Sequence, residues 1–258
     1  MHTSRQFSLQ TFNAAYNSLI CNGQFNEVPE YYQRYRSRYE YLMRLYASLS
    51  GNPPIDFLDI GGGQFATLAQ ALWKDRSVAA DFGVSHFEYL RENNVEPVEW
   101  NLCSSDQPFV NRFDVIMFSE VIEHLPIPGH LVLERLRLAL KPGGLLICTT
   151  PNLYRARNVV YMALGKRMFT HFQYPTNHGL GHILEYDEEH LRWQFERAGL
   201  QIDTLQQKHF PHSPTSLPYR VMAWIGAPLY LIPRFRDQHV VVAHSPPSGT
   251  VAHTSRQG

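Results

Sequence analysis

Residues 57–65, Phe57-Leu58-Asp59-Ile60-Gly61-Gly62-Gly63-Gln64-Phe65, decide the fold. A short apolar run, typical of a buried strand, leads into three consecutive glycines and then into a helical pattern. Glycine allows the backbone to turn sharply there while a ligand lies against it. The amides at the start of the following helix are then expected to point at that ligand. The stretch therefore predicts a strand–loop–helix unit that binds a nucleoside-like molecule.

Outward from this stretch, short apolar strands alternate with amphipathic helices. Such alternation predicts a doubly wound, mainly parallel α/β sheet with both faces covered. The strands are expected at 55–60, 77–82, 97–102, 113–118, 145–149, 200–204 and 239–243. The helices between them are expected at 64–74, 85–93, 128–140 and 187–198.

A helical segment precedes the first strand. Tyrosines and leucines recur at helical spacing over 30–49, while Arg34, Arg36 and Arg38 are expected to face water, and residues 1–29 show no clear period. The predicted organisation is a helical cap over 1–50, a domain over 51–245 with insertions at 153–181 and 209–236, and a disordered tail over 246–258.

Composition excludes several classes of protein. Apolar residues make up 44% of the 258, too many for a disordered chain, and the 23 basic and 23 acidic residues balance, which argues against broad adhesion to nucleic acid. Three cysteines without a CxxC make no disulfide framework, so a cytoplasmic setting is expected. The apolar stretch 221–233 falls short of the roughly 20 residues that span a bilayer. Its composition suits core, a homodimer contact or a peripheral membrane contact.

Two further features bear on the class of ligand that this loop binds. Asp81 ends the second strand, where a carboxylate can accept hydrogen bonds from both ribose hydroxyls of a nucleoside. Gly61-x-Gly63-x-x-Ala66 also satisfies the loose dinucleotide fingerprint, which would make the protein an NAD-dependent oxidoreductase. A tight turn without any ligand is the third interpretation.

Asp59 stands two residues before the first glycine, and the segment resembles D-x-G-x-G, the first motif of class I S-adenosylmethionine (SAM)-dependent methyltransferases, with Phe65 in place of a third glycine. Segments 113–125 and 140–147 resemble the fourth motif and the helix-to-strand turn of that family. The resemblance implies a Rossmann-like seven-stranded sheet of order 3-2-1-4-5-7-6 and SAM as cofactor. The implied SAM-binding residues are Asp59, Gly61, Gly63, Asp81, Phe82, Asn101, Leu102 and Ser119.

A second cluster follows the fourth strand, where open α/β sheets place their ligand crevice. Glu120, Glu123 and His124 would face one way on a first helical turn. Together with His182 in H-x-x-E-(aromatic), they resemble the small-RNA 3′-terminal 2′-O-methyltransferases, and E-x-x-E-H alone resembles the O-methyltransferases of ubiquinone biosynthesis. The resemblance implies a divalent metal (Mg, Mn, Fe or Zn) bound by Glu120, Glu123, His124 and His182, which would lower the pKa of a substrate oxygen.

The expected function is thus O-methylation of a small molecule or a sugar or glycan hydroxyl, with Glu120, His124 and His182 as catalytic groups. A metal-free variant would use His124 or His182 as general base. An RNA 3′ end is the second acceptor class. An NAD-dependent oxidoreductase and a non-catalytic SAM-binding protein are the alternatives from other classes.

Overall fold

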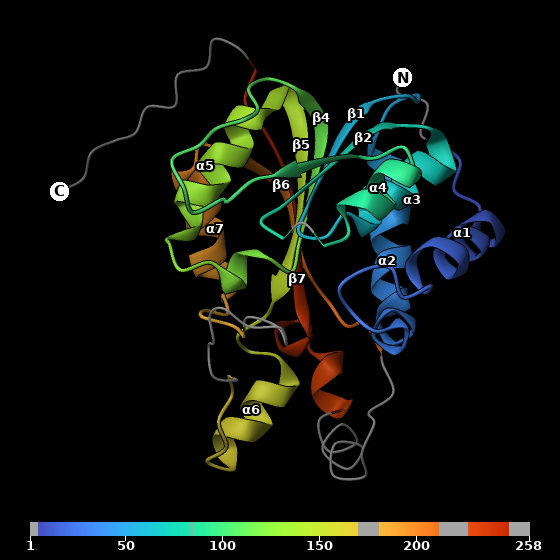
Figure 1. Ribbon diagram of the computed structural model, residues 1–258. Coiled ribbons are helices and arrows are strands. Elements are labelled where there is room, and N and C mark those ends of the chain that lie inside the picture. The colour runs from blue at the N-terminus through green and yellow to red at the C-terminus, as the bar shows by residue number, and fades with distance from the viewer. Residues whose placement is uncertain (1–4, 84, 170–180, 212–226, 248–258) are drawn as a thin grey trace.

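A seven-stranded sheet of order β3-β2-β1-β4-β5-β7-β6 forms the centre of the protein (Figure 1). This computed structural model describes residues 5–83, 85–169, 181–211 and 227–247. The first five strands are parallel, and β7 runs antiparallel between β5 and β6. The strands are β1 (Asp56–Ile60), β2 (Arg76–Asp81), β3 (Glu96–Glu99), β4 (Phe113–Ser119), β5 (Leu140–Pro151), β6 (Gln201–Lys208) and β7 (Gln238–His244). The predicted fold class and strand order are confirmed.

Helices cover both faces of the sheet (Figure 1). Apolar residues of α5 and α7 pack on one face, and those of α1 to α4 pack on the other. The α-helices are α1 (Leu9–Ala15), α2 (Pro29–Leu49), α3 (Gln64–Trp73), α4 (Phe87–Glu92), α5 (Gly129–Ala139), α6 (Ala156–Ala163) and α7 (Glu188–Arg197). A π-helical turn, η1 (Tyr16–Ile20), and the 3₁₀ turns η2 (Ile122–His124), η3 (Ala227–Leu231) and η4 (Pro233–Phe235) complete the described elements.

The N-terminal helices correct two sequence expectations. α1 and η1 lie where no period was expected, although Phe12, Tyr16 and Ile20 are buried at intervals of one helical turn. In α2, Arg34 is exposed as predicted, whereas Arg36 is half-buried and Arg38 is buried. The expectation that Arg38 faces water is wrong, because its guanidinium lies near the rings of Tyr35 and Tyr39 and pairs with Glu120, which follows β4 directly.

Parts of the predicted insertions and tail, residues 170–180, 212–226 and 248–258, lie outside the described residues. Within the described ranges, α6 follows β5 directly, and η3 and η4 precede β7. Every helix of those ranges is too short or too polar to cross a bilayer.

A buried ion pair ties the N-terminal segment to the sheet. Arg5 pairs with Asp75, whose two side-chain oxygens also accept from the Tyr46 hydroxyl (2.6 Å) and the Ile55 amide (3.0 Å). Both partners of the pair are almost fully buried. Removing one charge of such a pair leaves the other without compensation in a site of low polarity.

Asp75→Asn is therefore expected to lower the free energy of unfolding by about 3–5 kcal/mol, measured by urea denaturation. The matched control is Arg192→Gln, which breaks the exposed pair between Arg192 and Glu188. Exposed pairs contribute about 0–1 kcal/mol, so this variant should stay close to wild type. Equal losses in the two variants would contradict the assignment of Arg5–Asp75 as an anchor.

Candidate active site

The pairing of β1 with β4 brings two loops together at the carboxyl edge of the sheet. Ile60 is the register partner of Phe118, so the glycine loop after β1 lies beside the turn after β4. A Cβ atom built on Gly61 would lie only 2.6 Å from Cγ2 of Val121. The two loops are thus in direct contact, with no room for a side chain between them.

The glycine loop has the tight conformation that the sequence predicts. Gly61, Gly62 and Gly63 all have positive φ angles, of 93°, 112° and 82°. At Gly63 a Cβ would also lie 2.8 Å from the Cβ of Ala79. The Gln64 side chain reaches back across Gly62, and its amide donates to the Tyr32 hydroxyl (3.1 Å). Only glycine meets both the backbone and the space requirements of this turn.

Asp59 is buried beneath the loop and supports it. Its Oδ2 accepts hydrogen bonds from the amides of Phe65 (2.8 Å) and Ala66 (3.1 Å), the start of α3. Burial raises the pKa of this carboxyl to about 7. Two amides that were expected to point at a ligand are therefore engaged by Asp59, which holds the loop in shape from inside the protein.

The groups predicted to hold the nucleoside follow β2 and β3, the strands next to β1. The Asp81 carboxyl accepts from the Gly83 amide (3.1 Å), and burial raises the pKa of this carboxyl. Phe82 has 54% of its side chain exposed beside it. Asn101 accepts from the Cys103 amide (2.9 Å) and is exposed, whereas Leu102 is buried. Ser119, at the end of β4, shares a hydrogen bond with Thr149 (2.8 Å).

His86 belongs to the same region and was missed by the sequence analysis. It is buried between the rings of Phe25 and Phe87, at centroid distances of 5.8 and 5.7 Å. Neither ring nitrogen meets hydrogen-bond geometry with a described residue. Burial lowers the pKa of His86, and the nearby Asp81 carboxyl and Gly62 backbone act in the opposite direction. A single histidine among 13 carries no spacing signal that would have singled it out.

Glu120 takes a different direction from the one predicted. η2 is a 3₁₀ turn that begins only at Ile122, and Glu120 lies outside it with a left-handed φ of 57°. The prediction that Glu120, Glu123 and His124 share one face of a helical turn is therefore wrong. The Glu120 carboxylate instead pairs with Arg38 (3.0 Å) and accepts from Gln238 (2.6 Å) and Thr149 (2.9 Å).

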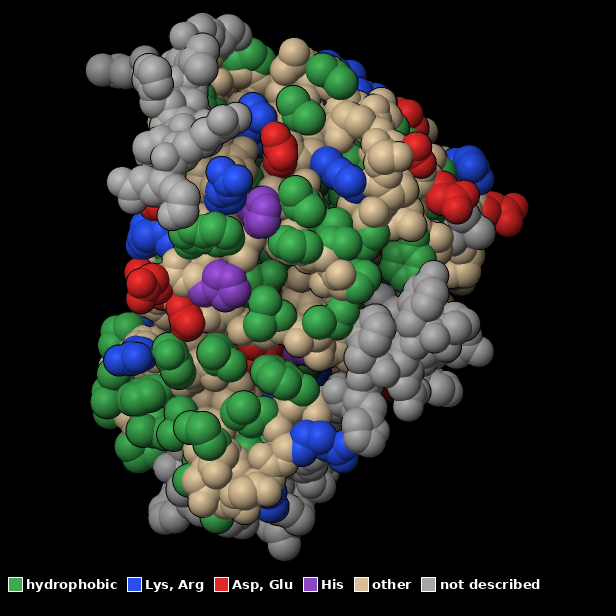
Figure 2. Space-filling view, turned by 90° about the vertical axis from the view of Figure 1, so that its left-hand side faces the viewer, with side chains coloured by type: hydrophobic (Ala, Val, Ile, Leu, Met, Phe, Trp, Pro, Cys, Tyr) green, Lys and Arg blue, Asp and Glu red, His purple; other side chains and the backbone are tan. Residues whose placement is uncertain are grey.

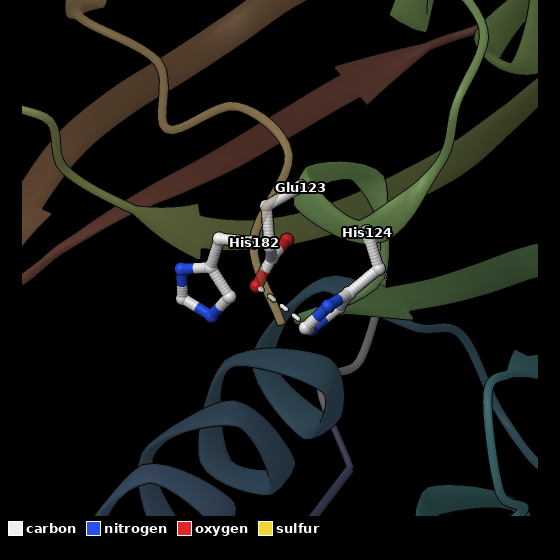
Figure 3. A group of neighbouring side chains, drawn as sticks. All are labelled: Glu123, His124 and His182. Atoms are coloured by element: carbon white, nitrogen blue, oxygen red, sulfur yellow. Dashed lines mark ion pairs between the residues drawn. The ribbon is translucent and has the colours of Figure 1, made fainter. Parts of the chain in front are cut away.

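The other three residues of the predicted cluster come together (Figure 3). Glu123, His124 and His182 each offer one ligand atom, and these atoms lie within 4.8 Å of one another. Glu123 is fully buried, with Oε2 accepting from the Thr150 hydroxyl (3.0 Å). Its Oε1 has no hydrogen-bond partner among the described residues and lies 3.9 Å from Nε2 of His124.

Both imidazoles of this cluster are held at Nδ1. His124 Nδ1 bonds the Gly181 carbonyl (2.6 Å), which can only accept, so this nitrogen carries the proton. His182 Nδ1 bonds the buried carboxylate of Glu185 (2.8 Å), which also pairs with Arg155. Nε2 of each ring is therefore available to accept a proton or to bind a metal.

The electrostatics of the cluster follow from its burial. Burial and the neighbouring Glu120 carboxylate raise the pKa of Glu123 well above its ordinary value. Burial lowers the pKa of His124, and so does the neighbouring His182 ring. The cluster thus disfavours an uncompensated negative charge on Glu123 and keeps His124 neutral, so a cation bound there would compensate the carboxylate and accept the lone pair of the imidazole.

Comparisons with known proteins identify the family and agree with the fold. Residues 32–205 match a family described as a methyltransferase domain. The fold is similar to that of a SAM-dependent methyltransferase from Archaeoglobus fulgidus (16% identity, TM-score 0.55, covering 83% of this chain and 97% of that one). It is also similar to geranyl diphosphate C-methyltransferase from Streptomyces coelicolor (13%, TM-score 0.54, covering 81% and 79%). No curated protein matches in sequence.

Gly61→Ala is expected to weaken binding of S-adenosylhomocysteine about tenfold or more, because the added methyl group meets Val121 and strains a left-handed backbone. Isothermal titration calorimetry measures this affinity. Gly143→Ala is the matched control, since Gly143 has a φ of 75° and nothing within 4 Å of an added Cβ. If both variants bound the ligand as wild type does, the glycine loop would not be the binding site.

Proposed function

The chain belongs to the methyltransferase-domain family, and we propose that it transfers the methyl group of SAM to a hydroxyl oxygen of a small molecule or sugar, assisted by a divalent cation. The fold alone does not determine the methylated atom, since one structural neighbour is named for methylation of carbon. The observation that supports oxygen is the buried Glu123 carboxylate between two imidazoles, at the edge of the sheet that carries the glycine loop.

In this proposal the cofactor lies along the carboxyl edge of β1, β2 and β3. Because Gly61 and Gly63 have no side chains, the cofactor can lie against the backbone of the loop, and Asp59 holds this loop in place from beneath. Asp81 accepts from the ribose hydroxyls, and the exposed ring of Phe82 lies against the adenine. Asn101, Leu102 and Ser119 complete the proposed set of cofactor-binding residues.

The reaction requires little from the protein beyond alignment and proton removal. A lone pair of the acceptor oxygen attacks the methyl carbon, the carbon–sulfur bond breaks, and the sulfur leaves as a neutral thioether. The hydroxyl proton must pass to a base. Without a cation, Nε2 of His124 or His182 can accept that proton, because Nδ1 of each ring is already engaged. With a cation bound at both Nε2 atoms, the lowered pKa of the hydroxyl would let the proton pass to water instead.

Glu123, His124 and His182 have the features expected of metal ligands. A buried carboxylate oxygen without a partner is costly, and a cation would compensate it. Each imidazole is oriented through Nδ1 by a carbonyl or a carboxylate, as ligating histidines commonly are. This donor set suits Mn²⁺, Fe²⁺ or Zn²⁺ better than Mg²⁺. A bound cation would lower the pKa of the acceptor hydroxyl.

Glu120 is proposed as a positioning group rather than a ligand. Its carboxylate is already paired with Arg38 of the N-terminal helix and bonded to Thr149 and Gln238. It therefore links the cap to the turn that carries Glu123. The predicted four-residue metal set is reduced to three in this proposal.

Glu123→Gln is expected to reduce the affinity for Mn²⁺ more than about 100-fold, because losing a ligand costs more than losing a residue that only orients one, which costs about 10–100-fold. Calorimetry on metal-stripped protein measures this affinity. Affinity for S-adenosylhomocysteine should stay near that of wild type, because the Glu123 carboxylate accepts from Thr150 of β5 rather than from the amides of the glycine loop. His130→Asn is the control, since His130 bonds Gln194 and is not part of the cluster.

The outcomes separate metal catalysis from base catalysis. If wild-type protein bound no Mn²⁺ and transferred methyl groups undiminished in a chelator, the cation would be ruled out. The loss of turnover in His124→Asn alone would then assign His124 as general base. Loss of nucleoside binding in Glu123→Gln would instead indicate misfolding, which circular dichroism checks.

Turnover of methyl-labelled SAM with a panel of alcohols, sugars, amines and RNA 3′ ends is expected to place the label on oxygen. Label on nitrogen or carbon would contradict the proposal. An RNA acceptor, the second candidate from the sequence resemblance, should bind less tightly as salt rises, whereas a small neutral acceptor should be insensitive to salt.

A further inference from the structure

We propose that the protein docks on anionic lipid bilayers through one end of the molecule, here called the docking face. It comprises residues 154–168, which include α6, and residues 227–235, which form η3 and η4. Residues 221–226 of the apolar stretch noted in the sequence lie outside the described residues. The inference does not depend on the methylated atom or on the metal.

Large apolar side chains are exposed together on this face. Met162 and Leu164, at the end of α6, have 65% and 59% of their surface exposed. Leu231 and Ile232, far along the chain, have 82% and 50% exposed. Figure 1 shows α6 below the sheet, and Figure 2 shows hydrophobic side chains gathered over the lower part of the same side of the molecule. α6 and η3 contact each other, so these side chains come from neighbouring elements. Exposed apolar surface gathered in this way marks an interaction site.

Buried contacts hold the two segments together. Asn152, directly after β5, is buried and donates to the carbonyls of Arg234 and Arg236, both at 2.8 Å. The Arg234 guanidinium lies 4.7 Å from the centre of the Tyr154 ring. The apolar side chains are therefore presented by a fixed framework.

The charge of the docking face identifies the partner. Exposed Lys166, Arg167 and Arg234 lie among the apolar residues, as does Arg157, which also pairs with Glu185 (3.8 Å). Neither segment contains Asp or Glu. The chain as a whole is neutral, so this positive charge is local. Apolar side chains surrounded by basic ones suit an anionic lipid surface. A second copy docked on the same face would place like charges together, which disfavours a dimer.

The docking face adjoins the proposed active site. Arg155, immediately before α6, pairs with Glu185, and Glu185 orients His182. Both segments also leave the sheet at the edge that carries Glu123, since Pro151 of β5 pairs with Gln238 of β7. Docking would therefore bring the proposed active site close to the lipid surface, where an acceptor with an apolar anchor would reside.

The test is co-sedimentation of the full chain with phosphatidylcholine vesicles, with and without phosphatidylglycerol. Wild type is expected to bind the anionic vesicles, and binding should weaken as salt rises. Leu231→Asp should reduce binding about tenfold or more, since it removes a largely exposed apolar anchor and adds a negative charge that anionic lipid repels. Lys166→Gln should reduce it about fivefold. Val110→Asp is the matched control, because Val110 is also exposed (63%) but lies before the amino end of β4, whereas the docking face lies at the carboxyl end of β5.

Three results would overturn the proposal. Wild type could stay in the supernatant with anionic vesicles, or Val110→Asp could reduce binding as much as Leu231→Asp. Alternatively, Leu231→Asp could convert a dimer to a monomer in size-exclusion chromatography, which would show that a second copy covers this face. Unchanged circular dichroism and S-adenosylhomocysteine affinity in Leu231→Asp establish that the variant is folded.

Discussion

The parallel pairing of β1 with β4 is the constraint on which the rest of the site depends. It is the point at which the strand order reverses, with β2 and β3 on one side and β4 and β5 on the other. Open α/β sheets bind their ligands at the loops that leave the carboxyl ends of such neighbouring strands. Here one loop is the glycine turn and the other carries Glu120 to His124, and the two touch at Gly61 and Val121.

The same constraint gives the two loops different tasks. The glycine loop has no side chains of its own, and Asp59 holds it from beneath by accepting from the first amides of α3. The turn after β4 changes direction at Glu120, whose left-handed backbone is of the strained kind often found at functional sites. Because of this change of direction, the Glu120 side chain pairs with Arg38, whereas the Glu123 side chain lies beside His124 and His182.

The sequence predicted what depends on local pattern. Buried strands and the glycine turn follow from apolar runs and from the one residue type that tolerates positive φ. The direction of the Glu120 side chain could not be predicted in this way. The sequence pattern indicated a helical turn that begins at Glu120, whereas the backbone forms a 3₁₀ turn that begins at Ile122. The burial of Arg38 and of His86 was also missed, because both depend on partners distant in the sequence. His182 could be named only through resemblance, since the chain segment that brings it to His124 is set by tertiary contacts.

A crystal structure of the protein with S-adenosylhomocysteine and Mn²⁺, with anomalous data for the metal, tests the central claim most directly. The account predicts the thioether ligand against the glycine loop and one anomalous peak bounded by Glu123, His124 and His182, on the side to which the sulfur points. A nucleoside bound elsewhere, or a peak at another set of side chains with this cluster closed on itself, would contradict it.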